Sequence, residues 1–140
     1  MKTTLVLDAC AMIAFLNDEP GADIVEELLV KAGENDIELI INALNALEIY
    51  YDVYRVDGAD MANKTLEKIR HLPIKIVDAI SNEVFQEAGK LKATCKISLA
   101  DSIALAEANV RQTQIVTADH HEFDELESEK KIKVLDSLKK

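Results

Sequence analysis

The chain has 140 residues, and 16 Lys and Arg against 26 Asp and Glu give it a formal net charge of −10. This length suits one domain with a sizeable hydrophobic core, so we expect a single domain over residues 1–140. The apolar content of 49% excludes a disordered chain. No apolar run approaches the roughly 20 residues that cross a bilayer. The acidic balance argues against a protein that holds nucleic acid mainly through a basic surface.

The first residues do not resemble a signal peptide, because the apolar stretch after Thr4 is short and ends at the charged Asp8. We therefore expect a soluble protein of the cytoplasm. The two cysteines, Cys10 and Cys95, lack the spacing of a disulfide scaffold or a zinc site. They are expected to be ordinary small buried residues.

Short apolar runs alternate along the chain with longer helical patterns. In chain order, the predicted elements are strand Thr4–Leu7, helices Ala9–Leu16 and Asp23–Lys31, strand Glu38–Ile41, helices Ala43–Val56 and Ala59–His71, strand Pro73–Val77, helices Ser81–Thr94 and Ser98–Asn109, and strands Gln114–Thr117 and Lys133–Leu135. Strands separated by helices imply right-handed crossovers and a parallel sheet covered on both faces. The sequence therefore predicts an α/β sandwich.

Two acids follow predicted strands, where open parallel sheets bind their ligands. Asp8 comes directly after the first strand, and Asp119 comes two residues after Thr117. If the two strands are neighbours, these carboxylates lie close together. Each acid also has a simpler interpretation: Asp8 as the N-cap of the helix that follows it, and Asp119 as a turn residue. The pattern leaves both interpretations open.

A third acid, Glu48, lies in a helix that is apolar nearly all round. Asn45, Glu48, Asp52 and Arg55 form its one polar stripe. A solvated stripe explains Asp52 and Arg55, whereas Glu48 is near enough to the start of the helix to reach the edge of the sheet that carries Asp8. Periodicity alone does not choose between these interpretations.

The fourth acid, Asp101, stands three residues after Ser98, which is the spacing of a capping box. Its helix is rich in alanine, and small side chains favour close packing against the sheet with the first turn at the sheet edge. The residues expected to be buried along one face of this helix are Leu99, Ile103, Ala106 and Val110.

Four carboxylates at one edge would repel one another unless a cation lay between them. Mg²⁺ and Mn²⁺ prefer such oxygen ligands, and the adjacent His120 and His121 are expected to lie in a surface loop rather than in a softer metal site. A carboxylate-held Mg²⁺ accepts phosphate oxygens, lowers the pKa of a water ligand and stabilises both oxygens of an in-line displacement. The acids therefore suggest hydrolysis of a phosphodiester.

Four segments of the chain together resemble a known family. They are Leu5–Ile13, Asn42–Tyr51, Ser98–Ala106 and Ile115–Phe123. In this order and spacing they resemble the PIN-domain ribonucleases, most closely the small VapC-type toxins of type II toxin–antitoxin pairs, over essentially the whole chain. The resemblance implies a PIN-like three-layer α/β sandwich, with a five-stranded parallel sheet and helices on both faces. It also implies a Mg²⁺- or Mn²⁺-dependent endoribonuclease.

The resemblance also implies roles for individual residues. Asp8, Glu48, Asp101 and Asp119 match the four acids of the family, and Thr117 matches a hydroxyl residue that supports the site by hydrogen bonding. Asp8 and Asp101 would contact the metal most directly. Glu48 would bind it through water or orient the nucleophile, and Asp119 would hold a second cation or the water network. Cleavage would leave a 5′-phosphate and a 3′-hydroxyl.

The implied partners are an RNA substrate and a small antitoxin, whose C-terminal segment would insert into the groove with an Arg or Lys reaching the acids. The helices predicted over Ala43–Val56 and Ala59–His71 offer apolar surface for a homodimer. One departure from the family is Cys10, which stands where such proteins more often carry Ser or Thr.

Two alternatives remain. One is a non-catalytic protein of the same fold that binds other proteins through its acidic faces. The other is a phosphoaspartate receiver or a dehalogenase-like phosphatase built around Asp8. The phosphatase needs a second acid at the position of Cys10, and the receiver needs an acceptor Asp after a later strand, where none is well placed.

Overall fold

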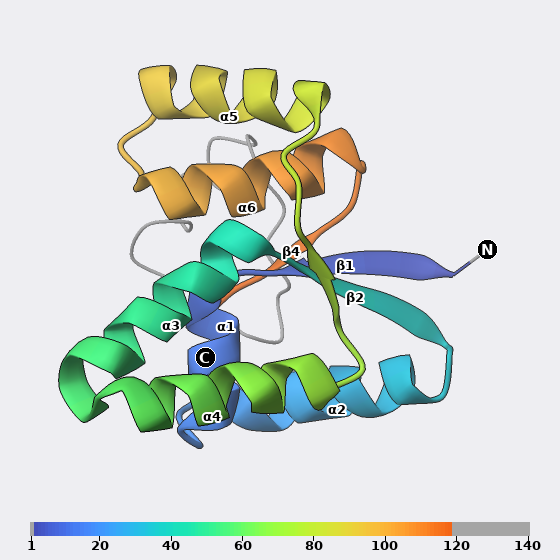
Figure 1. The fold of residues 1–140 in the computed structure, drawn as a ribbon. Helices are drawn as coiled ribbons and strands as arrows, with labels where there is room; N and C mark the ends of the chain where they lie inside the picture. Colours follow the sequence, from blue (N-terminus) through green and yellow to red (C-terminus); the bar gives the residue numbers. More distant parts are fainter. Residues whose placement is uncertain (1, 119–140) are drawn as a thin grey trace.

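A parallel β-sheet enclosed by helices forms the centre of the molecule (Figure 1). The computed structural model of the chain describes residues 2–118. The elements are β1 Thr3–Leu7, α1 Ala9–Leu16, α2 Ala22–Gly33, β2 Ile37–Asn42, α3 Ala43–Asp57, α4 Ala59–His71, β3 Lys75–Val77, α5 Asn82–Thr94, α6 Leu99–Val110 and β4 Ile115–Val116.

The sheet has the strand order β3-β2-β1-β4, and every pair is parallel. Strand β1 therefore has a partner on each side, with Val6 opposite both Ile40 and Ile115. Since all the strands run the same way, their carboxyl ends meet at one edge, and α1 and α3 begin there directly after β1 and β2 (Figure 1). This edge is where the sequence places its candidate acids.

Alternate residues of the strands pack against opposite helical layers. Val6 and Ile40 join a core cluster with residues of α5 and α6, whereas Leu7 and Ile41 join a second cluster with residues of α1, α2, α3 and α4. Burial on both faces is characteristic of parallel sheets. The prediction of a three-layer α/β sandwich with helices on both faces is confirmed (Figure 1).

The structure differs from the sequence-based expectation in some details. Its described part contains four strands rather than five, because the fifth predicted strand, Lys133–Leu135, lies outside the described residues. In α6, Ile103 is buried as expected, but Leu99 is 59% exposed and Val110 is 38% exposed. Leu99 is the first residue of the helix and lines an open pocket with residues of α5, and Val110 is the last residue of the helix. Neither cysteine is fully buried; each is half-buried.

A single glycine joins α3 to α4. Gly58 ends one helix and begins the next with φ 91°, a left-handed value that costs glycine little because it has no Cβ. The two helices and α1 together enclose a groove of about 350 Å³, and Lys64 and Lys68 of α4 contribute to its lining.

Within the described residues, no helix combines the length and the apolar character that a membrane span requires.

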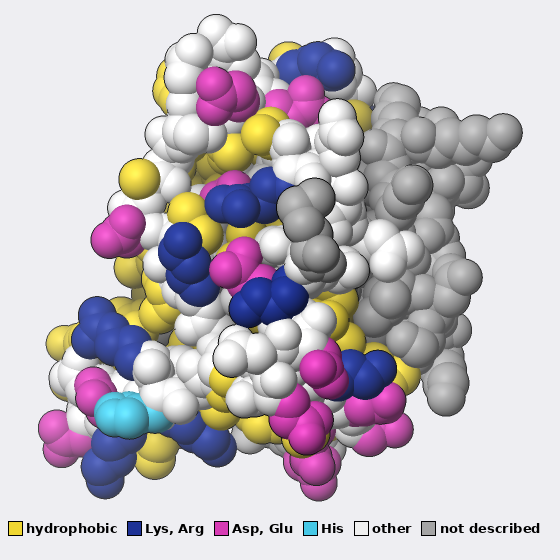
Figure 2. Space-filling model, turned by 90° about the vertical axis from the view of Figure 1, so that its right-hand side faces the viewer, with side chains coloured by type: hydrophobic (Ala, Val, Ile, Leu, Met, Phe, Trp, Pro, Cys, Tyr) yellow, Lys and Arg dark blue, Asp and Glu magenta, His cyan; other side chains and the backbone are white. Residues whose placement is uncertain are grey.

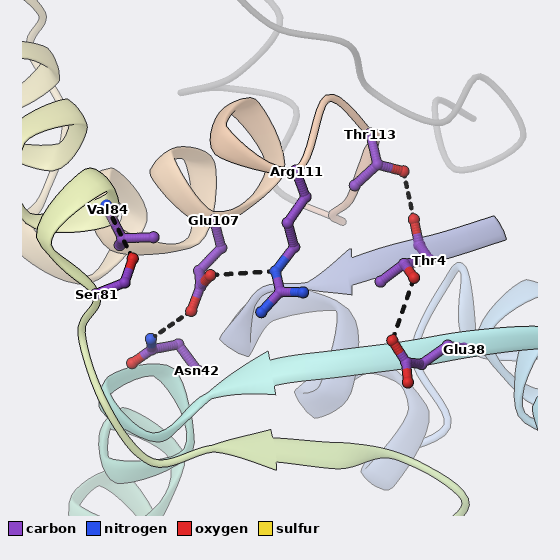
Figure 3. Close-up of polar contacts among 8 residues, drawn as sticks. All are labelled: Thr4, Glu38, Asn42, Ser81, Val84, Glu107, Arg111 and Thr113. Atoms are coloured by element: carbon purple, nitrogen blue, oxygen red, sulfur yellow. Dashed lines mark hydrogen bonds and ion pairs between the residues drawn. The ribbon is translucent and has the colours of Figure 1, made fainter. Parts of the chain in front are cut away.

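A buried acid connects α6 to the start of α3 (Figure 3). Glu107 of α6 is 2% exposed and accepts a hydrogen bond of 2.8 Å from Asn42 Nδ2. Its other oxygen pairs with Arg111 Nε at 3.3 Å. Asn42 is the last residue of β2, and its Oδ1 accepts a hydrogen bond from Leu44 N, so it also caps α3. Glu107 therefore fixes the point where strand becomes helix.

We expect Glu107→Ala to lower the free energy of unfolding by about 2 kcal/mol, because the buried amide of Asn42 would lose its acceptor. Arg111 is partly exposed, and water can solvate it after the substitution. Glu107→Gln keeps an acceptor oxygen and should cost less than about 1 kcal/mol. Urea unfolding followed by circular dichroism measures both values, and equal losses in the two variants would contradict this role of Glu107.

Candidate active site

The Asp8 carboxylate lies fully buried at the carboxyl end of the central strand β1. Its Oδ1 accepts a hydrogen bond of 2.8 Å from Ala11 N, so the interpretation of Asp8 as the N-cap of α1 is confirmed. Its Oδ2 accepts a second hydrogen bond, of 2.5 Å, from Thr117 Oγ1. Capping does not exclude a role in a site, since these contacts orient the carboxylate at the edge where parallel sheets bind ligands.

Thr117 reaches Asp8 because β1 and β4 are neighbours. Leu7 lies opposite Val116, and Asp8 N donates to Val116 O at 3.3 Å. Thr117 follows directly and is 1% exposed. Residues 109 positions apart in the chain are thus joined by a buried side-chain hydrogen bond.

The polar stripe of α3 divides into an exposed half and an inner half. Asp52 and Arg55 form an exposed ion pair of 2.8 Å, which confirms the interpretation of a solvated stripe for these two residues. Glu48 is half-buried. Asn45, one turn before Glu48, is fully buried, and its Nδ2 donates a hydrogen bond of 2.9 Å to Ala100 O.

Asp101 lies in the first turn of α6 and is 7% exposed. Its N–H donates to Ser98 Oγ at 3.1 Å, so the predicted N-cap is confirmed. The positive end of the helix dipole favours a carboxylate at this position. Because Asn45 binds the carbonyl of the preceding residue, Ala100, the first turn of α6 is attached to α3.

These contacts connect the ends of β1 and β4, and they also connect α3 to α6. The predicted site residues in the described part of the chain lie on or directly after these elements. Asp8 and Thr117 are in direct contact. Glu48 and Asp101 lie on helices that are joined by the hydrogen bond from Asn45 to Ala100. Asn45 lies one turn before Glu48, and Ala100 directly precedes Asp101. The fourth predicted acid, Asp119, and the two histidines that follow it lie outside the described residues.

The donor groups at this edge are carboxylate and amide oxygens, which hard divalent cations prefer. Within residues 2–118, no three His, Cys, Asp or Glu side chains form a group that could hold a metal ion. Mg²⁺ is commonly bound through one or two carboxylates and several waters. The buried Asn45 Oδ1 has no hydrogen-bond partner in the described part of the chain, which leaves an oxygen acceptor beside the first turn of α6. The donor chemistry therefore fits Mg²⁺ or Mn²⁺.

The opposite side of the molecule, where the strands begin, carries mixed charge. Figure 2 shows basic and acidic side chains interspersed on this side rather than gathered by sign. Although acidic residues are in excess in the composition, this side of the molecule is not uniformly acidic.

Comparison with solved structures shows the same fold in proteins of low sequence identity. The chain is similar to VapBC2 from Rickettsia felis bound to a DNA fragment from their promoter, with 16% identity, a TM-score of 0.75, and coverage of 95% of this chain and 98% of that one. DNA-bound VapBC from Salmonella typhimurium gives 15% identity and a TM-score of 0.73, covering 96% and 98%. VapC20 from Mycobacterium tuberculosis, named as a sarcin–ricin loop cleaving toxin, gives 10% identity and a TM-score of 0.61, covering 81% and 86%.

A search against curated proteins returns no match. The family model of the PIN domain matches residues 5–129, which include every predicted site residue. The parallel sheet with helices on both faces agrees with the fold that the resemblance implies. On this match, the chain belongs to the PIN domain family.

Proposed function

We propose that this protein is a divalent-metal-dependent endoribonuclease and the toxin of a type II toxin–antitoxin pair. The observation that carries the proposal is the buried Asp8 carboxylate, held by Ala11 N and Thr117 Oγ1 at the carboxyl end of the central strand. The helices of Glu48 and Asp101 are bonded to each other by the Asn45–Ala100 contact. The family match supports a nuclease, and the VapC-type neighbours support a toxin.

In this proposal, Asp8 and Asp101 would hold Mg²⁺ or Mn²⁺ most directly, Glu48 through water, and Asp119 would complete the site or hold a second cation. The bound cation would acidify a water ligand and neutralise charge that develops on the phosphate oxygens.

The chain's own residues would orient the reacting groups. Thr117 donates to Asp8 Oδ2 and so restricts the carboxylate to one orientation. Glu48, which is half-buried, would orient the attacking water. The substrate we propose is RNA, cut to leave a 5′-phosphate and a 3′-hydroxyl. One similar structure is named for cleavage of the sarcin–ricin loop, which supports this substrate class.

The partner we propose is a small antitoxin. Several of the similar structures are named as toxin–antitoxin or VapBC complexes. A carboxylate site without its cation carries negative charge that an Arg or Lys side chain of a partner would neutralise. Such a side chain would compete with the metal for the acids and so inhibit the enzyme.

We also propose that the protein forms a homodimer through α3. Leu47, Tyr51 and Tyr54 are each about half exposed, at 52%, 51% and 51%. Their i, i+4, i+7 spacing places them on one side of the helix. A two-fold axis beside this face would bury the same apolar residues from both subunits.

One prediction concerns Asp101. Asp101→Asn removes one negative ligand while keeping the size of the side chain, and RNA cleavage with Mn²⁺ should slow by about 100-fold or more, equivalent to about 2.7 kcal/mol. Cleavage of structured RNA by purified protein, followed on gels over time, measures the rate. Wild-type activity should vanish in excess chelator.

The control for Asp101→Asn is Asp52→Asn, which alters an exposed acid of α3 and should leave the rate unchanged. Equal rates for wild type and Asp101→Asn, or activity that persists in chelator, would overturn the assignment. If calorimetry also detected no Mn²⁺ binding, the non-catalytic interaction module would become the better description.

Another prediction tests the hydrogen bond that holds Asp8. Thr117→Val keeps the shape of the side chain but loses its hydrogen bond to Asp8 Oδ2, and Mn²⁺ affinity or cleavage rate should fall by about 10-fold. Thr117→Ser keeps the hydroxyl and should retain most activity. Thr113→Val is a matched control, because Thr113 donates to the carbonyl of Thr4 at the other end of β1. Equal effects of Thr117→Val and Thr113→Val would contradict a specific role for Thr117.

A separate prediction concerns the dimer. Tyr51→Glu places a charge in the proposed apolar interface, and the protein should change from dimer to monomer in light scattering after size exclusion. Val30→Glu introduces the same charge at another exposed apolar position, 56% exposed in α2, and should leave the dimer intact. A monomeric wild type would remove the proposed interface.

A further inference from the structure

Asn45 is a fully buried amide whose two ends have different environments. Its Nδ2 donates a hydrogen bond of 2.9 Å to Ala100 O in the first turn of α6. Its Oδ1 is buried and has no hydrogen-bond partner in the part of the chain that the structure describes. Asn42, one turn earlier, has both ends satisfied, since its Oδ1 accepts from Leu44 N and its Nδ2 donates to Glu107.

The orientation of the Asn45 amide is determined by its partner. A backbone carbonyl can only accept a hydrogen bond, so the NH₂ group must face Ala100 O. Rotating the amide by half a turn would place Asn45 Oδ1 against Ala100 O, and two acceptor oxygens cannot form a hydrogen bond. The NH₂ group would then face away from this carbonyl. The carbonyl of Asn45 is therefore the end that remains available for a donor.

Buried polar atoms almost always have a hydrogen-bond partner, and an exception calls for a water, an ion or a ligand. The position of Asn45 indicates which of these is needed. Asn45 precedes Glu48 by one turn of α3 and so lies on the same side of that helix. Its bond to Ala100 places it beside the residue that precedes Asp101. The unsatisfied carbonyl belongs to the region between the helices of these two acids.

We propose that Asn45 is a positioning residue of the metal centre, with its NH₂ group holding the first turn of α6 and its carbonyl accepting a hydrogen bond from a water ligand of the divalent cation. This inference rests on the proposed function. A cation polarises the water that it binds and makes it a stronger donor, so such a water requires acceptors around it. The Asn45 carbonyl supplies one without adding to the negative charge of the acids.

The test measures Mn²⁺ binding rather than cleavage. Isothermal titration calorimetry of the full chain with Mn²⁺ gives the dissociation constant, and circular dichroism checks that each variant is folded. Asn45→Ala should raise the dissociation constant by about 10- to 100-fold, the usual effect of removing a group that supports a metal ligand.

The matched control is Asn109→Ala. Asn109 also lies in α6 and also donates an amide hydrogen bond of 2.9 Å between helices, but to Glu87 of α5. This variant should bind Mn²⁺ as wild type does, because its contact lies near the far end of α6. If Asn45→Ala fails to fold, Asn45→Ser replaces it, with weakened binding expected again.

The outcomes separate the inference from the function on which it rests. An unchanged dissociation constant in Asn45→Ala, or in Asn45→Ser where that variant is used, overturns the role of Asn45 while leaving the nuclease proposal intact. Equal weakening in Asn109→Ala assigns the loss to helix packing in general and also overturns the inference. A wild type that binds no Mn²⁺ contradicts the proposed function itself.

Discussion

The hydrogen bond between Asp8 and Thr117 links the fold to its candidate site. A carboxylate at the end of a central strand is removed from water, and its burial is tolerated only because donors surround it. Ala11 supplies one donor from the start of α1, and Thr117 supplies another from the end of β4. Pairing of β1 with β4 and orientation of the carboxylate therefore depend on each other. A chain that misplaced β4 would leave Asp8 with an incomplete set of partners.

A second constraint acts between α3 and α6. Apolar contacts are not directional and by themselves allow helices to slide by small amounts. Two side-chain amides prevent this, because Asn42 binds Glu107 and Asn45 binds Ala100. Hydrogen bonds are directional, so the pair defines both the register and the rotation of one helix against the other. Glu48 and Asp101 lie on these two helices, so the alignment of the helices also positions the two acids.

Local patterns predicted most of the fold, because helices and buried strands differ in the spacing of their apolar residues. The N-cap residues Asp8 and Ser98 are also recognisable in the sequence. The order of the strands does not follow from these local patterns. Nothing in the sequence states that β1 lies between β2 and β4, yet this order brings Thr117 to Asp8. The burial of Asn45 was also missed, since periodicity identifies a polar stripe but not how far another helix covers it. The convergence of all four acids stays a prediction, because Asp119 lies outside the described residues.

The single-glycine joint at Gly58 has a consequence for how this scaffold could diversify. The groove is lined by α1, α3 and α4, whereas the candidate site lies at the ends of β1 and β4 and in the N-terminal halves of α3 and α6. Gly58 has a φ of 91°, which residues with a Cβ rarely adopt, so a substitution there would favour a different angle between α3 and α4. A change at Gly58 in a related chain would therefore alter the groove and leave in place the hydrogen bonds that hold Asp8 and Asn45.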